Sequence, residues 1–383
     1  MALTNKLSAI GDAIREKTGK TELLTLDAMP LEIASIETGG GGDIEVEPIV
    51  LTGNCSYACS GAMASRYIEL FGDTVSTEKL TNCESMFKDY KLESIPFDIN
   101  ISANSVGVVL NDMYYNCNNL KTLPKIPYYN VYNISRMFYY CYNLREIPED
   151  YFDGWDFTDC KNEKNQYYRN ASYMFGYCNS LRKIPLHIFE NMNPVANYNY
   201  TYFNSLCDNC YVLDELVNMP VPYTATYTSN IWGIGTFQNC YRLKNLTLQV
   251  NEDGSPLVKQ WKSQTINLSL STGWANVNWN IIRYNSGITA DKEVKDDATY
   301  QALKNDPDWF SCDINYSRYN HDSAVNTINT LPDTSAYLAT AGGTNTIKFK
   351  GAAGAKTDGG AINTLTAEEI AVATAKGWTV SFY

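Results

Sequence analysis

Met137-Phe138-Tyr-Tyr-Cys141-Tyr-Asn-Leu144-Arg-Glu-Ile147-Pro148 decides the fold, because the pattern Met-Phe-x-x-Cys-x-x-Leu-x-x-Ile-Pro returns along the chain. Each position of the pattern is called a slot below. A second full copy spans Met174 to Pro185. Partial copies keep most slots: Met113, Tyr114, Cys117, Leu120, Leu123 and Pro124; Leu206, Cys210, Leu213 and Leu216; Phe237, Cys240, Leu243 and Leu246; and, one residue shorter, Met86, Phe87, Tyr90, Leu92, Ile95 and Pro96. Recurrence at this length indicates a repeat architecture.

The spacing within one copy predicts its local structure. The Phe slot and the Cys slot three residues later would share one face of a short helical turn. The Leu and Ile slots before the proline suit a short strand. One unit cannot bury its own apolar stripe, so we expect successive units to stack, Cys over Cys and Leu over Leu. The expected fold is an α/β repeat with surface insertions, of which 149–170 is the largest.

These slots resemble the BspA-like class of leucine-rich repeats, which occurs in bacterial surface adhesins, protist surface proteins and proteins encoded by phages of gut bacteria. The resemblance covers residues 45–250. It implies a leucine-rich-repeat solenoid of short strands and short helices. It specifies the fold far more than the ligand.

Residues 1–38 predict a separate helical module for attachment or oligomerisation. Apolar residues at helical spacing would form its contact surface: Leu7, Ile10, Ile14, Leu26 and Ile33. Two short helices have too little core to stand alone, so they need a partner or copies of themselves, with a trimer favoured. Gly39–Gly42, within a linker over 39–44, would decouple the module from the repeats.

The segment LTNKLSAIGDAIREKTGKTELLTLDAMPLEIASI resembles the N-terminus of tail, fibre and other structural proteins of phages that infect Firmicutes. The resemblance implies that other virion structural proteins are its partners. The alternative is a helical cap that packs on the first repeat, against which the tetraglycine argues.

Residues 251–383 are interpreted as degenerate repeats and a C-terminal cap. The sequence predicts strands over 265–271, 346–350 and 378–383 and helices over 298–303, 323–331 and 370–376. Thr366-x-x-Glu369 forms a capping box, and Gly377 would end the last helix. The segments YNHDSAVNTINTLPD and GAINTLTAEEIAVATAKGWTV also resemble phage-encoded members of the family.

Charge and hydropathy exclude several classes of partner. A formal charge of −12 argues against nucleic acid, which requires clustered Lys and Arg. We find no apolar run of about 18 residues for a membrane span and no secretory signal at the N-terminus. The resemblance to phage structural proteins implies the virion as the expected localisation, after synthesis in the host cytoplasm without a signal. Asn-x-Ser triplets such as Asn133-Ile-Ser135 and Asn170-Ala-Ser172 carry no glycosylation meaning without a signal.

The cysteines favour a buried column over a metal site. Cys207-x-x-Cys210 and Cys55-x3-Cys59 approach zinc spacing, but His187 and His321 supply no paired ligands. Five cysteines share one repeat slot, where stacking demands a small apolar side chain: Cys117, Cys141, Cys178, Cys210 and Cys240. We predict reduced thiols, no metal and no cofactor.

The sequence contains no catalytic motif that we recognise, neither a phosphate loop, nor a Gly-x-Ser-x-Gly elbow, nor a His-Glu-x-x-His helix. We therefore predict no enzymatic activity and name no catalytic residue. A glycosidase carboxylate pair depends on spatial separation and stays open.

Tyrosine is the conspicuous residue, with 29 Tyr against 13 Phe, often beside asparagine. Tyr and Asn together are the mix that antibody paratopes use, and Tyr also stacks on sugar faces. The structural alternative is that each Tyr only covers helix surface. As a set they predict a binding surface for a host glycan or protein, with these candidates: Tyr128, Tyr129, Tyr139, Tyr140, Tyr167, Tyr168, Tyr198 and Tyr200.

Two functions follow from these features. The leading one is a phage virion protein, a tail-associated fibre or receptor-binding adhesin. The alternative is a BspA-like bacterial cell-surface adhesin, and a cell-wall glycan hydrolase is a distant third.

Overall fold

The computed structural model describes residues 48–102, 107–127, 131–155, 169–185, 201–219, 221, 236, 240, 243, 245–268, 316–317, 321–349, 356–357 and 364–382, together with Asp12, Arg15 and Glu16. The predicted attachment residues Leu7, Ile10, Ile14, Leu26 and Ile33 lie outside this part of the chain, as does the predicted helix over 298–303.

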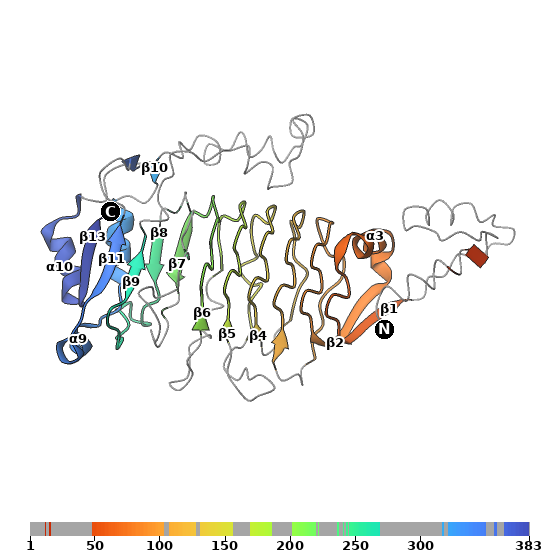
Figure 1. Ribbon diagram of the computed structural model, residues 1–383, viewed down its shortest axis with the longest axis horizontal. Coiled ribbons are helices and arrows are strands. Elements are labelled where there is room, and N and C mark those ends of the chain that lie inside the picture. The colour runs from red at the N-terminus through yellow and green to blue at the C-terminus, as the bar shows by residue number, and fades with distance from the viewer. Residues whose placement is uncertain are drawn as a thin grey trace.

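A parallel sheet runs along the first half of the described chain, and its strands follow sequence order. The strands are β1 (Ile49–Asn54), β2 (Val75–Asn82), β3 (Val108–Val109), β4 (Val131–Asn133), β5 (Arg169–Asn170) and β6 (Thr201–Tyr202). Each pairs in parallel with the next, so one strand per unit is laid beside its predecessor (Figure 1). Helix α3 (Gly61–Phe71) and the 3-10 turn η1 (Gly72–Thr74) connect β1 to β2.

The second half continues with parallel pairing and adds helices. β7 (Glu215–Met219) pairs with β8 (Asn245–Leu248), and β11 (Asn345–Phe349) lies between β9 (Thr265–Asn267) and β13 (Trp378–Phe382). α8 (His321–Thr330) packs on β8, where the Leu248 N–H donates to Thr330 Oγ1 at 2.9 Å. α9 (Ser335–Ala341) and α10 (Ala367–Ala375) follow, and β10 (Tyr316–Ser317) pairs with β12 (Lys356–Thr357).

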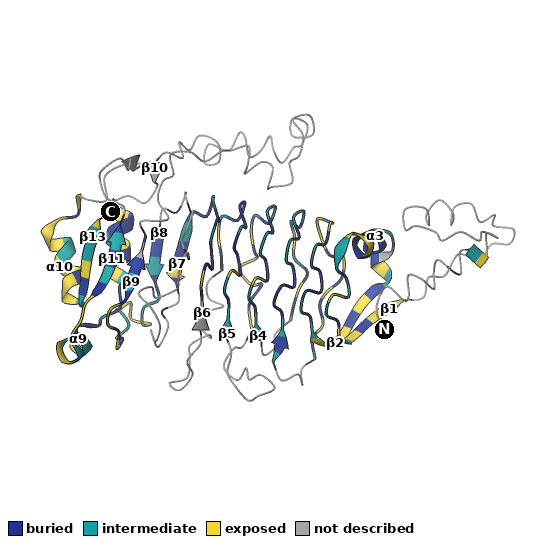
Figure 2. Ribbon diagram, viewed as in Figure 1, coloured by how far each residue is buried: buried dark blue, intermediate teal, exposed yellow. Residues whose placement is uncertain are grey.

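The C-terminal predictions agree with these elements. Thr366 and Glu369 form the predicted capping box of α10. Gly377 has φ +82°, and the chain then enters β13 at Trp378. Figure 2 shows buried residues along the middle strands and exposed ones on α9, α10 and the outer side of β1.

The predicted helical turn between the Phe and Cys slots is wrong. The turn of the copy at Phe237 lies outside the described residues, and the other five copies instead form tandem tight turns over a turn segment of six residues: 84–89, 111–116, 135–140, 172–177 and 204–209. In the first, the N–H groups of Met86, Lys88 and Tyr90 donate to carbonyls three residues back, while those of Ser85, Phe87 and Asp89 donate to the next turn segment, at Asn111, Met113 and Tyr115. A helix would direct every N–H along its own axis, so it could not hydrogen-bond the neighbouring repeat.

The strand predicted at the Leu and Ile slots forms only in the copies without proline. Leu216 in β7 pairs with Leu246 in β8, and both side chains are buried. The copies that end in Pro96, Pro124, Pro148 or Pro185 have no strand there within the described residues. Proline has no N–H to give to a ladder, which accounts for the missing strand in these copies. A second strand lies ahead of each of the five described turn segments, whether or not the copy ends in proline: β2, β3, β4, β5 and β6.

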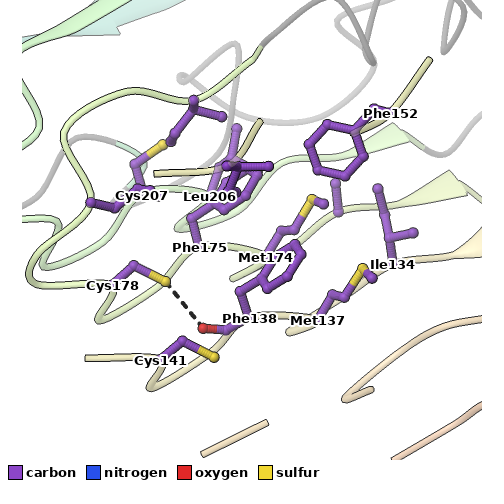
Figure 3. Packing of buried hydrophobic residues seen from close by; sticks show 14 of the residues in the cluster. Ile134, Met137, Phe138, Cys141, Phe152, Met174, Phe175, Cys178, Leu206 and Cys207 are labelled. Atoms are coloured by element: carbon purple, nitrogen blue, oxygen red, sulfur yellow. Dashed lines mark hydrogen bonds between the residues drawn. The ribbon is translucent and has the colours of Figure 1, made fainter. Parts of the chain in front are cut away.

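The Phe slots stack ring on ring through the interior. Ring centroids of Phe87 and Tyr114 are 5.6 Å apart, those of Tyr114 and Phe138 5.4 Å, and those of Phe138 and Phe175 5.7 Å, with interplanar angles of 12°, 12° and 4°. All four rings are fully buried. Figure 3 shows Phe138 and Phe175 beside Met137 and Met174. Such rings contribute both burial and about 0.5–1.5 kcal/mol per pair from their geometry.

The Cys slots form a second ladder, which explains the choice of cysteine. Each thiol donates to the Phe-slot carbonyl of the preceding unit: Cys117 to Phe87 at 2.9 Å, Cys141 to Tyr114 at 3.1 Å, Cys178 to Phe138 at 3.1 Å and Cys210 to Phe175 at 3.0 Å. Figure 3 shows the hydrogen bond from Cys178. Cys240 donates in the same way to Cys207, at 3.1 Å. The predicted buried column of free thiols is confirmed at all five positions. Burial raises the pKa of these thiols, so at neutral pH they are protonated donors.

Asparagine side chains stabilise the start of the turn segments, a role that was not predicted from the sequence. The side-chain oxygens of Asn54, Asn82, Asn133 and Asn170 accept from the N–H two residues on, at 2.8–3.0 Å. This is an Asx turn, which starts a chain reversal locally. The Asx turn accounts for the asparagine of the Asn-x-Ser triplets at Asn133 and Asn170, whereas the serine supplies only its backbone N–H, as Glu84 does after Asn82.

Candidate functional site

Two residues of each turn segment have a positive φ, in the left-handed region of the Ramachandran plot. These residues lie two positions before and two positions after the Phe slot: Ser85 and Asp89, Asp112 and Asn116, Arg136 and Tyr140, Tyr173 and Tyr177, and Ser205 and Asn209. Asp, Asn and Ser tolerate a positive φ through local hydrogen bonds, whereas bulky residues rarely adopt it. Most copies use the tolerant types.

Tyrosine occupies three of these costly positions. Tyr140, Tyr173 and Tyr177 have φ of +66°, +57° and +60°. A side chain other than glycine in this region costs about 1 kcal/mol or more. Tyrosine is therefore present at some conformational cost where Asp, Asn or Ser occupies the same slot in other copies.

These tyrosines belong to one continuous cluster over three successive turn segments. Tyr139 lies 5.6 Å from Tyr115, 4.2 Å from Tyr140 and 5.4 Å from Tyr177, measured between ring centroids. Tyr140 lies 4.7 Å from Tyr177 and 5.7 Å from Tyr142. With Tyr173, which is 5.6 Å from Tyr139, and the electrostatically coupled Tyr211, these residues are called the tyrosine face. Tyr173 is exposed and the others are half-buried, so the rings offer both apolar area and hydroxyl groups to a partner.

A glycine makes room for the central ring. A Cβ on Gly176 would come within 2.7 Å of two ring carbons of Tyr139. Gly176 stands in the slot that Tyr115 and Tyr139 occupy in the two preceding copies. The ring of Tyr139 therefore lies over a position that has no side chain. The glycine thus sets the orientation of Tyr139.

Cations border the first end of the tyrosine face. The Lys88 ammonium lies 4.9 Å from the centre of the Tyr115 ring, and the Arg136 guanidinium carbon lies 5.9 Å from it. Arg136 also pairs with the Asp112 carboxylate at 2.7 Å. This end is therefore charge-balanced within the protein.

A carboxylate marks the other end. Asp208 is half-buried, and burial raises its pKa to about 6. The Asn209 side-chain amide donates to it at 2.6 Å. Burial raises the pKa of Tyr177 and also that of Tyr211, the latter to about 12, and Asp208 adds to both shifts. Asp208 therefore lies close enough to act on both rings.

The structure brings Tyr139 and Tyr140 together but describes no other predicted tyrosine. Tyr128, Tyr129, Tyr167, Tyr168, Tyr198 and Tyr200 lie outside the described residues. Tyr139 and Tyr140 belong to a turn segment, so the alternative that they only cover helix surface is wrong for this pair. Five members of the tyrosine face were missed: Tyr115, Tyr142, Tyr173, Tyr177 and Tyr211. Each stands at one of a few offsets from the Phe slot: two residues before it, or one, two or four residues after it. These offsets become informative only when the outward slots are known.

Among the described residues, no three His, Cys, Asp or Glu side chains gather as a metal site. No helix in the described part of the chain is long and apolar enough to cross a membrane. No family model, curated protein or solved structure matches this chain.

Proposed function

We propose that the protein is a phage virion component, a tail-associated fibre or receptor-binding adhesin that contacts the host surface through the tyrosine face. The observation that carries this proposal is the placement of Tyr140, Tyr173 and Tyr177 at left-handed positions. Conformational cost at exposed or half-buried aromatics favours recognition, because most of the other described copies carry Asp, Asn or Ser at these two positions.

The proposed fold is a BspA-like leucine-rich-repeat solenoid. Parallel strands in sequence order and in-register ladders of rings and thiols support it. Such a stack holds side chains of successive copies at the strand spacing of about 4.8 Å, which gives a rigid surface for an extended ligand. The ligand class proposed is a host surface glycan or protein.

The proposed attachment is through residues 1–38, with other virion proteins as partners and a homo-oligomer, a trimer favoured, as the assembly. Deleting Met1–Gly42 is expected to leave host-cell binding per molecule and the melting temperature unchanged, while incorporation into particles is lost. Cell-binding isotherms, circular dichroism and particle incorporation measure the three quantities. An unfolded truncated protein would show that the segment is a cap, and normal incorporation would place attachment elsewhere.

A further inference from the structure

Helices α8 and α10 meet at the imidazole ring of His321. This residue is the first of α8, and its Nδ1 lies 3.1 Å from Oδ1 of Asp322 on the same helix. Its Nε2 lies 3.0 Å from Oε1 and 3.1 Å from Oε2 of Glu369, which belongs to the first turn of α10. Both ring nitrogens of His321 therefore face carboxylate oxygens.

The number of protons on the ring decides whether both contacts are favourable. A neutral imidazole carries one N–H, so it donates to Asp322 or to Glu369 and turns a nitrogen lone pair toward the other carboxylate. The imidazolium carries two N–H groups and donates to both carboxylates in charge-assisted hydrogen bonds. The geometry therefore fits the protonated form of His321.

The capping box of α10 holds Glu369 in this position. Oε2 of Glu369 accepts from the Thr366 N–H at 2.7 Å, and the Glu369 N–H donates to Thr366 Oγ1 at 3.2 Å. At the opposite end of α10, the Lys376 ammonium donates to the Ile328 and Asn329 carbonyls of α8 at 3.0 and 2.7 Å. The two helices are thus linked at both ends, and the link at His321 belongs to a side chain that titrates near neutral pH.

We propose that His321 is a pH-dependent clip, which holds α10 against α8 when the ring is protonated and loosens that contact as the pH rises. α8 packs on β8, and α10 packs on β13. The clip therefore joins the last helix and strand of the chain to the sheet of β7 and β8. This regulation is independent of the tyrosine face and of the proposed function.

The pH range of the clip follows from the groups that face the ring, which among the described residues are Asp322 on α8 and Glu369 on α10. Their hydrogen bonds raise the pKa of His321 above its usual value of about 6.5, and partial burial opposes them. The Thr366 N–H, and then His321, hold the pKa of Glu369 below its usual value, so this carboxylate keeps its charge in mild acid. The stabilisation is therefore fully present below a pH of about 6.5 and is lost as the pH rises through the raised pKa of His321.

An NMR titration of the histidine ring protons in the full chain tests the protonation of His321. The chain has two histidines, so a His187→Gln background leaves the His321 signal alone. We expect a titration midpoint above about 6.5. Glu369→Gln should lower this midpoint, and it keeps the capping box because glutamine also serves at that position. Glu368→Gln, at the exposed neighbouring carboxylate, is the matched control and should leave the midpoint almost unchanged.

Hydrogen exchange of the α10 amides tests the clip itself. Exchange rates in His321→Gln are divided by those of the parent at the same pH, because the intrinsic rate then cancels. Glutamine mimics the neutral imidazole, with a donor for Glu369 and no charge. We expect α10 to exchange about two- to fivefold faster in the variant at a pH of about 6, as for a partly exposed ion pair, and equally fast at a pH of about 9.

An exchange ratio that does not change with pH, or a His321 midpoint at or below the usual histidine value, would overturn the proposal. The same midpoint in Glu369→Gln as in Glu368→Gln would overturn it as well. Circular dichroism on each variant distinguishes these outcomes from misfolding.

Discussion

Phe138→Ala is expected to lower the free energy of unfolding by about 3–5 kcal/mol, the cost of emptying a fully buried aromatic site. Phe138 lies between Tyr114 and Phe175 in the ring stack, so both neighbours lose a face. Tyr151, 6.3 Å away, loses an edge contact as well. The cavity left by Phe138→Ala cannot close fully, because hydrogen bonds between copies hold the turn segments at a fixed spacing.

Urea unfolding of Phe138→Ala beside Phe382→Ala measures this difference. Phe382 is 36% exposed at the end of β13, so its loss should cost about 1 kcal/mol or less. Similar losses in both variants would mean that the rings do not form a continuous core.

Replacement of Tyr140 and Tyr177 together by asparagine is expected to weaken host-cell binding at least tenfold. Each ring should contribute on the order of 1–2 kcal/mol as an interface anchor. Asparagine accepts the positive φ that both positions require, and Asn116 and Asn209 occupy the same slot in other copies. The melting temperature should therefore stay the same or rise slightly.

Tyr57→Asn is the matched control. Tyr57 is another tyrosine at a positive φ, 58°, in the first tight turn, and it lies outside the tyrosine face. Adsorption isotherms and thermal unfolding are measured on the same samples. Undiminished binding by the double variant would exclude this surface, and a large loss of stability would show that both rings are structural.

The sequence predicted what depends on the periodic burial of apolar residues. The Met, Phe, Cys and Leu slots are buried as their spacing required, for example at Met137, Phe138, Cys141 and Leu144. The last helix was also predictable, because Thr366 and Glu369 form a local capping signal that needs no tertiary information.

The turn segments escaped prediction because no glycine marks their left-handed residues. Ser85, Asp112, Arg136 and Tyr173 hold one such position in successive copies, and only the hydrogen bonds to the next copy make it favourable. A spacing of three between Phe and Cys is common to a helix and to these turns, so periodicity alone could not choose between them.

Most of the tyrosine face escaped prediction for the same reason. In a helix, Tyr139 and Tyr140 would have pointed to different sides, whereas the tandem turns direct both into one cluster with Tyr177. The distant partners Gly176 and Asp208 come from later copies, and only stacking brings them near.

Hydroxyl-radical footprinting of tyrosine, with and without host cells, tests the central claim most directly. Protection should fall on the peptides that carry Tyr139, Tyr140, Tyr173 and Tyr177, while Tyr57, which is 54% exposed, should react equally in both samples. Equal labelling of the tyrosine face in the presence and absence of cells, or protection confined to Tyr57, would contradict the claim that this face binds the host.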